Sequence, residues 1–210
     1  LFSCIDSCLL QEKFDDFDLV IVDDHSPSPI ESLLLTKYTD SQLRRIKVIR
    51  NSDNLGLGGS LNAGIQAIDA QYIARIDDDD INSPQRLHKQ TEFLDSNSDV
   101  SVLGSSVWAA SKHYDYFHVI NNFDLPILRP HSEFSSVLPL KPESTLVFHP
   151  TAMIPLKTFD HFGMYRQFRR CQDKELWLRI LSMNGTIANL VEPLVVYHTA
   201  SYKRSLSKQL

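Results

Sequence analysis

Four consecutive aspartates, Asp77–Asp80, follow the apolar run Tyr72–Ile76 and come shortly before Pro84. Two carboxylates about 4 Å apart repel each other by roughly 4 kcal/mol at an effective dielectric constant near 20. A cluster of this kind must therefore be well solvated, partly protonated or neutralised by a cation. Which of these applies is the main functional question that the sequence raises.

The spacing of these aspartates favours a divalent cation. Alternate side chains of an extended segment point the same way, so Asp77 and Asp79 can face one ligand while Asp78 faces elsewhere. Mg²⁺ and Mn²⁺ often take only one or two protein carboxylates and complete their shell with phosphate oxygens and water. The competing interpretation is a solvated loop in which Asp80 or Ser83 caps the next helix. We favour the metal site.

Other ligand-binding motifs that are built from aspartate or glycine are incomplete in this chain. An EF-hand calcium loop is excluded because Ile81 falls on a ligand position. The glycine-rich segment Asn51–Ile65 fails as a dinucleotide fingerprint, since Leu61 stands where the third glycine would fall, and as a P-loop, since Ile65–Gln66 replaces Lys–Ser/Thr. What remains is a loop at a helix N-terminus whose backbone can approach a nucleotide or hold a tight turn.

The remaining polar candidates each have a structural interpretation. Asp173 begins an amphipathic helical pattern, where the helix dipole favours an acidic side chain, and Glu175 and Arg179 are spaced as a surface i,i+4 pair. Considered alone, Asp173 is therefore better explained by the helix than by catalysis. His149 and His198 are more often core or surface histidines than ligands.

The aspartates must be positioned by alternating strands and helices. Apolar strands joined by helices imply a parallel sheet covered on both faces, and such sheets bind ligands outside the carboxyl ends of their strands. Asp23–Asp24 and Asp77–Asp80 both lie at such ends, so we expect two acidic loops in one cleft. Expected strands are 18–22, 46–50, 72–76, 100–107, 186–190 and 194–198, with another over 145–154 interrupted at Pro150. Expected helices are 1–11, 28–38, 60–70, 85–96 and 172–185.

Composition gives coarse limits. The 210 residues carry a net charge of −5 with 42% apolar and 22% charged residues, which predicts a soluble globular protein without general attraction to nucleic acid. Two basic groups, Gln167–Cys171 and Ser201–Lys208, run against that balance. Three cysteines, Cys4 and Cys8 at half-buried positions and Cys171, form no disulfide framework and indicate a reducing compartment. No bilayer-spanning run and no signal peptide is recognisable.

Six segments follow one another along the chain: VIVDDHS, NLGLGGSLNAGI, YIARIDDDDINSPQRLHKQ, HPTAMI, QDKELWLR and VVYH. In this order they resemble glycosyltransferase family 2, the inverting enzymes with a GT-A fold, and especially bacterial surface-polysaccharide members. The resemblance covers nearly the whole chain and implies one α/β GT-A domain over 1–210, with a mostly parallel central sheet and helices on both faces. Residues 1–106 would bind nucleotide and metal, and 107–210 the acceptor.

The resemblance also implies roles for individual residues. A nucleotide-sugar donor, by default a UDP-sugar, would be bound by Asp23, Asp24, Asn54, Gly56, Asn62, Asp77 and Asp78. Mg²⁺ or Mn²⁺ would be held by Asp79 and His198. Asp173 would be the general base, removing a proton from the acceptor hydroxyl as that hydroxyl attacks the anomeric carbon from the opposite face. One displacement inverts that carbon through an oxocarbenium-like state, and the cation acts as a Lewis acid for the leaving diphosphate.

The same resemblance leads us to expect a glycan or lipid-linked acceptor and no nucleic-acid partner. We expect a cytoplasmic enzyme that can associate peripherally with the inner membrane face. Two departures from the family pattern stand out: Gln172 replaces the glutamate that usually precedes the base, and the family's first strand, which would precede Leu1, is expected to be missing.

Three alternatives stay open. Gln172 and the expected missing strand are compatible with a catalytically impaired GT-A-like domain that binds nucleotide without turnover. A phosphatase or phosphotransferase of the haloacid dehalogenase type would use Asp77 as a nucleophile, although in this chain the aspartates follow the third recognisable strand. A nucleotidyltransferase is similar in architecture but would carry a glycine- and lysine-rich loop near its start, and none is recognisable.

Overall fold

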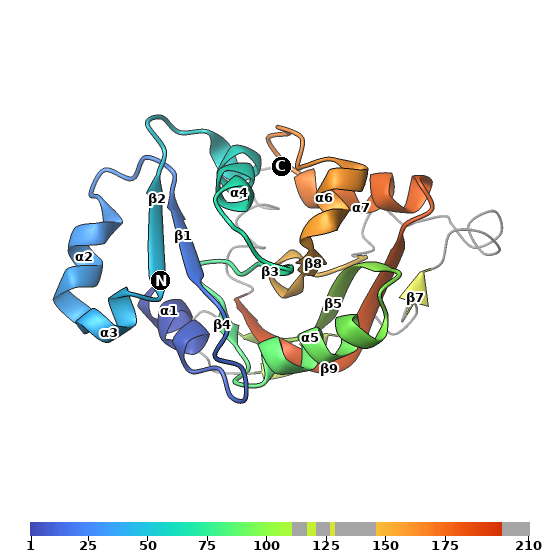
Figure 1. The fold of residues 1–210 in the computed structure, drawn as a ribbon, viewed down its shortest axis with the longest axis horizontal. Helices are drawn as coiled ribbons and strands as arrows, with labels where there is room; N and C mark the ends of the chain where they lie inside the picture. The colour runs from blue at the N-terminus through green and yellow to red at the C-terminus, as the bar shows by residue number, and fades with distance from the viewer. Residues whose placement is uncertain (111–116, 121–126, 129–145, 199–210) are drawn as a thin grey trace.

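The computed structural model describes residues 1–110, 117–120, 127–128 and 146–198 (Figure 1). Helices and strands alternate in the first half of this part, as expected, and strands become more frequent in the second half. In chain order the elements are α1 (Phe2–Leu9), β1 (Leu19–Asp23), α2 (Ile30–Lys37), α3 (Asp40–Leu43), β2 (Ile46–Arg50), α4 (Gly56–Gln66), β3 (Tyr72–Ala74), β4 (Ile81–Asn82), α5 (Arg86–Ser96), β5 (Val100–Ala110), β6 (Phe117–Ile120), β7 (Ile127–Leu128), the 3-10 turn η1 (His149–Thr151), β8 (Met153–Pro155), α6 (Leu156–Phe162), α7 (Gln172–Ser182) and β9 (Thr186–His198).

The strands form two sheets. β1 and β2 pair in parallel over five residues, from Leu19 opposite Ile46 to Asp23 opposite Arg50. The larger sheet has the order β3-β8-β5-β9-β4, with β6 beside β5 and β7 beside β9. In this sheet β5 and β9 are parallel and the other pairs are antiparallel. The α/β class is confirmed, but the expectation of a mostly parallel sheet is wrong.

The reason lies in the connections. A parallel neighbour needs a crossover of a dozen or more residues, whereas an antiparallel neighbour does not. β4 follows β3 after only the aspartate loop, so it pairs instead with the end of β9, with Ile81 opposite Val196. The two strands expected at 186–190 and 194–198 are one strand, β9, whose register shifts on β5 close to Pro193.

Helices cover both faces of the larger sheet, as expected, with α5 on one side and α6 and α7 on the other (Figure 1). Successive strand residues point to opposite faces, so Val102 packs toward α7 while its neighbour Leu103 packs toward α5. A third apolar cluster lies around β1 and β2. Its buried members are Ile5, Leu34 and Tyr38.

One helix begins earlier than the sequence pattern indicates. α4 starts at Gly56, four residues before the expected start, so Gly56, Gly58 and Gly59 lie within the helix rather than in a loop. Asp24 explains the difference, because its carboxylate accepts the backbone N–H groups of Leu55 and Gly56, both at 2.8 Å. Free N–H groups at a helix N-terminus need such an acceptor, and this one comes from 31 and 32 residues earlier in the chain.

Arg86, at the start of α5, connects the elements around the aspartates. Its side chain is almost completely buried, at 1% exposure. The guanidinium donates to Asn82 Oδ1 at 2.6 Å, Gln90 Oε1 at 2.9 Å, Arg75 O at 2.8 Å and Ala152 O at 3.3 Å. Burial lowers the pKa of Arg86 to about 10, so it remains charged at neutral pH. All four acceptors are neutral, and each would be left without this donor if the side chain were removed.

We therefore expect Arg86→Leu to lower the free energy of unfolding by about 3 kcal/mol, because it leaves several buried acceptors unsatisfied. Urea denaturation followed by circular dichroism measures the change. Lys89→Ala, on the same helix, removes only the surface ion pair with Glu192 and should cost less than about 0.5 kcal/mol. Equal losses in the two variants would contradict the assignment of Arg86 as the structural centre of this region.

Candidate functional site

Asp77, the first of the four aspartates, is held by a cation from its own chain segment. Arg75 lies two residues earlier and is 8% exposed. Its Nη1 donates to Asp77 Oδ2 at 2.8 Å, and its Nη2 contacts Asp77 Oδ1. This two-point contact of guanidinium and carboxylate neutralises one of the four charges.

The last of the four, Asp80, is buried and only 1% exposed. Its Oδ1 accepts the backbone N–H of His198 at 2.9 Å, and His198 Nδ1 lies 3.9 Å from the same oxygen. Burial raises the pKa of Asp80 to about 7; the hydrogen bond from His198 opposes this rise, and the charges of Asp77 and Asp79 reinforce it. Its Oδ2 is buried and accepts no hydrogen bond from the described residues.

Asp78 and Asp79, in the middle of the loop, are exposed and present their charge to solvent. No group of three or more His, Cys, Asp or Glu side chains in the described part of the chain is arranged to enclose a metal. Mg²⁺ and Mn²⁺ do not need such a cage, because one or two carboxylates with phosphate oxygens and water suffice. The buried Asp80 Oδ2, which lacks a hydrogen-bond partner, and the exposed Asp79 beside it fit a cation of this kind.

Helix α1 supports the loop from beneath. Cys4 Sγ donates to Asp77 O at 3.2 Å, and Asn82 Nδ2 donates to Cys8 Sγ at 3.2 Å. Both cysteines are buried, at 6% exposure each. They were expected to be half-buried; the structure places them deeper because α1 packs directly on β4 and the aspartate loop.

The second acidic pair is engaged by its own surroundings. Asp23 accepts the backbone N–H of Ser26 at 2.8 Å and pairs with Arg50. Asp24 accepts Asn51 Nδ2 at 2.8 Å in addition to the start of α4. Burial alone would raise the pKa values of both carboxyls, but these hydrogen bonds outweigh it and hold both pKa values below the ordinary value. Both stay ionised at neutral pH.

Of the three residues expected from the glycine-rich segment, two contact Asp24. Asn54 Nδ2 donates to Asp24 O at 3.2 Å, and Gly56 adopts a positive φ of 71° as it donates to Asp24 Oδ2. Asn62 lies further along α4, and its side chain forms two hydrogen bonds with the backbone of Tyr165. Their expected contacts with a nucleotide stay predictions.

Asp173 lies in the first turn of α7 and is partly exposed. Beneath it, Tyr165 and His149 are buried, and the Tyr165 hydroxyl lies 3.0 Å from His149 Nε2. Burial raises the pKa of Tyr165; the charge of Arg75 opposes this rise, and that of Asp173 reinforces it. Arg75 and Asp173 therefore both act electrostatically on the Tyr165 hydroxyl.

Two important residues were missed by sequence reasoning. Arg75 stands two positions before Asp77, a spacing that puts both side chains on one face of an extended segment; this signal was available in the sequence. Asp80 was considered only as a helix cap. Its burial depends on contact with the end of β9, 118 residues later, and no local pattern indicates that contact.

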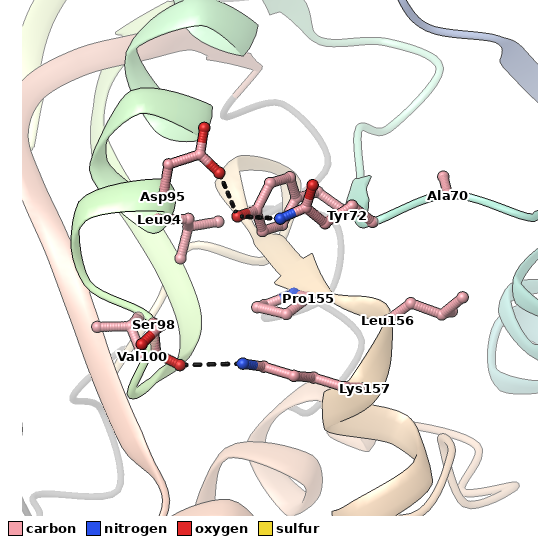
Figure 2. A pocket seen from close by; sticks show the side chains of 10 residues that line it. Ala70, Tyr72, Leu94, Asp95, Ser98, Val100, Pro155, Leu156 and Lys157 are labelled. Carbon is pink, nitrogen blue, oxygen red and sulfur yellow. Dashed lines mark hydrogen bonds between the residues drawn. The ribbon is translucent and has the colours of Figure 1, made fainter.

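A pocket of about 320 Å³ lies elsewhere, at the opposite end of β3 from the aspartates. Figure 2 shows Tyr72 donating to Asp95, at 2.6 Å, and Lys157 donating to Ser98 O, at 3.0 Å, across its walls. None of the residues expected at the site lines it. We assign it no part in the chemistry.

Comparison with known proteins decides the family. The model of the family described as Glycosyl transferase family 2 matches residues 1–177. The chain belongs to glycosyltransferase family 2. The matched range includes the pair Asp23–Asp24, the aspartate loop Asp77–Asp80 and Asp173. It therefore contains every site residue expected from the sequence except His198.

Curated relatives of this family 2 chain have names that refer to polysaccharide synthesis. It is 27% identical to the amylovoran biosynthesis glycosyltransferase AmsE of Erwinia amylovora, over 96% of this chain and 71% of that protein. It is 29% identical to the O-antigen biosynthesis glycosyltransferase WbnJ of Escherichia coli, over 96% and 76%. An uncharacterized glycosyltransferase of Methanocaldococcus jannaschii is 28% identical, with 95% of this chain covering 66% of that protein.

Among solved structures, Staphylococcus aureus TarS in complex with UDP superposes with a TM-score of 0.69 at 18% identity. The match covers 94% of this chain and 56% of the TarS chain. The GT-A fold expected from the sequence is thereby confirmed. The described helices include none that is long and apolar enough to cross a membrane.

The raised pKa of Asp80 predicts a specific pH dependence of stability. The folded state holds this proton up to about pH 7, whereas the ordinary carboxyl releases it near 3.8. The unfolded chain therefore binds fewer protons within this window, and the contribution of Asp80 to the free energy of unfolding falls as pH rises through it. At about 1.36 kcal/mol per pKa unit, the fall is up to about 4 kcal/mol.

Asp80→Asn removes this titration. In buffer with a chelator, we expect the variant to gain stability relative to the unmodified protein as the pH is raised from 4 to 7.5, as measured by urea denaturation at each pH. Asp78→Asn, at the exposed neighbour, serves as the matched control and should show no comparable trend. A difference between Asp80→Asn and the unmodified protein that stays constant with pH would contradict the assignment.

Proposed function

We propose that this chain is the catalytic domain of an inverting glycosyltransferase. It moves a sugar from a nucleotide-diphosphate donor, a UDP-sugar, to an acceptor hydroxyl during synthesis of a bacterial surface polysaccharide. The observation that carries the proposal is the arrangement of the aspartate loop. Arg75 neutralises Asp77, and Asp80 is buried with its Oδ2 lacking a hydrogen-bond partner among the described residues. Asp79, next to this oxygen in the chain, is exposed. The family match and the relatives named for polysaccharide synthesis support it.

On the donor side, residues 1–106 bind the nucleotide and the cation. Asp79 and His198 hold Mg²⁺ or Mn²⁺, with Asp80 beside them, and the cation when bound supplies Lewis-acid stabilisation of the leaving diphosphate. Asp77 and Asp78 flank the ribose. Of the second acidic pair, Asp24 has the more exposed carboxyl and contacts the nucleotide directly, while Asp23, with a side chain 1% exposed, shapes the loop. TarS has been solved with UDP and with UDP-GlcNAc, which makes UDP the first nucleotide to test.

On the acceptor side, residues 107–210 supply the base. Asp173 accepts the proton of the acceptor hydroxyl as that oxygen attacks the anomeric carbon, and the bond to the diphosphate breaks on the opposite face. Asp173 lies in the first turn of α7, where the helix dipole favours a negative charge, and its carboxylate is partly exposed to an incoming acceptor. The acceptor is a glycan or a lipid-linked sugar, reached from the cytoplasmic side of the membrane.

Of the alternatives, a phosphatase that uses Asp77 as nucleophile is disfavoured because Arg75 occupies both oxygens of that carboxylate. The impaired-domain alternative draws on Gln172, which is 6% exposed and has a buried Oε1 without a partner among the described residues. A glutamate in this place would add a charge next to Asp173. Its absence leaves the presumed base itself in position.

The metal–nucleotide site can be tested by calorimetric titration of UDP with and without Mn²⁺. We expect binding that depends on Mn²⁺ and weakens at least tenfold in Asp79→Ala, because the exposed carboxylate holds the cation. Asp95→Ala, at an exposed aspartate in the remote pocket of Figure 2, is the control and should bind as the unmodified protein does. Binding of UDP that ignores both Mn²⁺ and Asp79 would overturn the donor-side assignment.

The base is tested separately by Asp173→Asn. This substitution keeps the shape of the side chain and removes its ability to accept a proton at neutral pH. We expect sugar transfer or donor hydrolysis to fall by about 10²-fold or more while the Kd of UDP with Mn²⁺ stays within about twofold. If the unmodified protein binds UDP but Asp173→Asn is as active as it is, the base lies elsewhere.

A further inference from the structure

The side chain of Asn62 forms a two-way contact with a segment far along the chain. Its Nδ2 donates to Tyr165 O at 2.8 Å, and its Oδ1 accepts the Tyr165 backbone N–H at 3.0 Å. The two residues are separated by 103 positions. A side-chain amide that pairs with both backbone groups of one residue fixes that residue's position as a strand partner would.

Gly58, one helical turn before Asn62, lets the same remote segment lie close to α4. A Cβ atom at Gly58 would lie 3.0 Å from Arg166 O and 3.8 Å from Gln167 Cα. Residues four apart on a helix share a face, so Gly58 and Asn62 present one face of α4 to consecutive residues of the segment 163–171. The glycine allows the backbone of this segment to lie directly against the helix.

The segment 163–171 leads directly into α7 and the presumed base. At its start, Arg179 donates to the carbonyl oxygens of Gly163 and Met164, both at 2.9 Å. At its end, Cys171 has a left-handed backbone with φ of 60°, and α7 begins at the next residue. Between these ends, Asn62 holds Tyr165 and Gly58 lies against Arg166 and Gln167, so α4 bears on how the segment approaches the first turn of α7, where Asp173 lies.

The same helix is tied to the donor side. Asp24 caps the start of α4 through Leu55 and Gly56, and one turn later Gly58 and Asn62 hold the segment before Asp173. Helix α4 thus connects the acidic loop after β1 with the start of α7, as Figure 1 shows by the place of α4 between β1 and α6–α7.

We propose that Asn62, together with Gly58, is a positioning residue that fixes the base-bearing segment relative to the donor site. This rests on the proposed function, in which Asp173 is the base, and it replaces the expected role of Asn62 as a nucleotide ligand. The two roles make opposite demands on the protein. A ligand residue governs nucleotide affinity, whereas a positioning residue governs turnover and leaves affinity unchanged.

Two substitutions disturb the contact in different ways. Asn62→Ala removes both hydrogen bonds. Gly58→Ala leaves Asn62 in place but pushes on Arg166 O, and alanine is at the same time the better helix former by about 1 kcal/mol. Gln66→Ala is the control, because Gln66 lies one turn further along α4 and is exposed, and its amide contacts only Met164 Sδ at 3.9 Å in the described part of the chain.

The experiment measures three quantities for each protein, together with its thermal stability. They are the Kd of UDP with Mn²⁺, the rate of hydrolysis of whichever of UDP-glucose, UDP-galactose and UDP-GlcNAc the unmodified protein cleaves fastest, and amide hydrogen exchange over 163–173. For Asn62→Ala and Gly58→Ala we expect at least tenfold slower hydrolysis, at least tenfold faster exchange at Tyr165 and Arg166, and a Kd within about twofold. Gln66→Ala should match the unmodified protein in all three.

A Kd that rises tenfold in Asn62→Ala would overturn the proposal and return Asn62 to the nucleotide. Unchanged hydrolysis in both variants, despite faster exchange, would also overturn it, because the contact would then be structural only. Slower hydrolysis in Gly58→Ala at undiminished thermal stability supports it, since general destabilisation cannot produce that result. Failure of the proposed function looks different: the unmodified protein would neither bind UDP nor cleave any of the three donors.

Discussion

The repulsion among four adjacent carboxylates is the constraint on which the rest of the structure depends. The fold reduces it in three ways: Arg75 pairs with Asp77, burial beside β9 raises the pKa of Asp80 to about 7, and Asp78 and Asp79 face solvent. What remains is a local negative charge of limited size and one buried oxygen, Asp80 Oδ2, that has no hydrogen-bond partner within the described part of the chain. A divalent cation that carries a diphosphate would neutralise the remaining carboxylate charge and supply a partner for this oxygen.

This solution requires elements from both ends of the chain. Arg86 donates a hydrogen bond to the backbone carbonyl of Arg75, and Cys4 of α1 donates to that of Asp77. At the end of β9, the backbone N–H of His198 donates to Asp80. On the other side of the site, helix α4 joins Asp24 to the segment that carries Asp173. The donor and acceptor halves are therefore positioned by a few buried polar contacts between remote residues, while the apolar clusters on both faces of the sheet provide stability.

Local patterns were sufficient for most helices and strands, because apolar spacing and caps are encoded within a dozen residues. They failed where a remote residue decides the outcome. α4 starts early because Asp24 caps it, and the larger sheet is mixed because β4 pairs with β9. In the site, the aspartate spacing predicted where charge would gather, but the protonation of Asp80 and the contact of Asn62 with Tyr165 depend on residues more than 100 positions away. Arg75 is different, since its spacing from Asp77 was visible.

The central claim is that the aspartate loop, with Asp77 paired to Arg75 and Asp80 buried, binds a divalent cation together with a nucleotide diphosphate. Anomalous diffraction from a crystal grown with Mn²⁺ and UDP tests this most directly. The account predicts one manganese peak beside Asp79, with the diphosphate on its far side and the Arg75–Asp77 pair intact. Manganese and UDP bound elsewhere, or a cation that displaces Arg75 from Asp77, would contradict it.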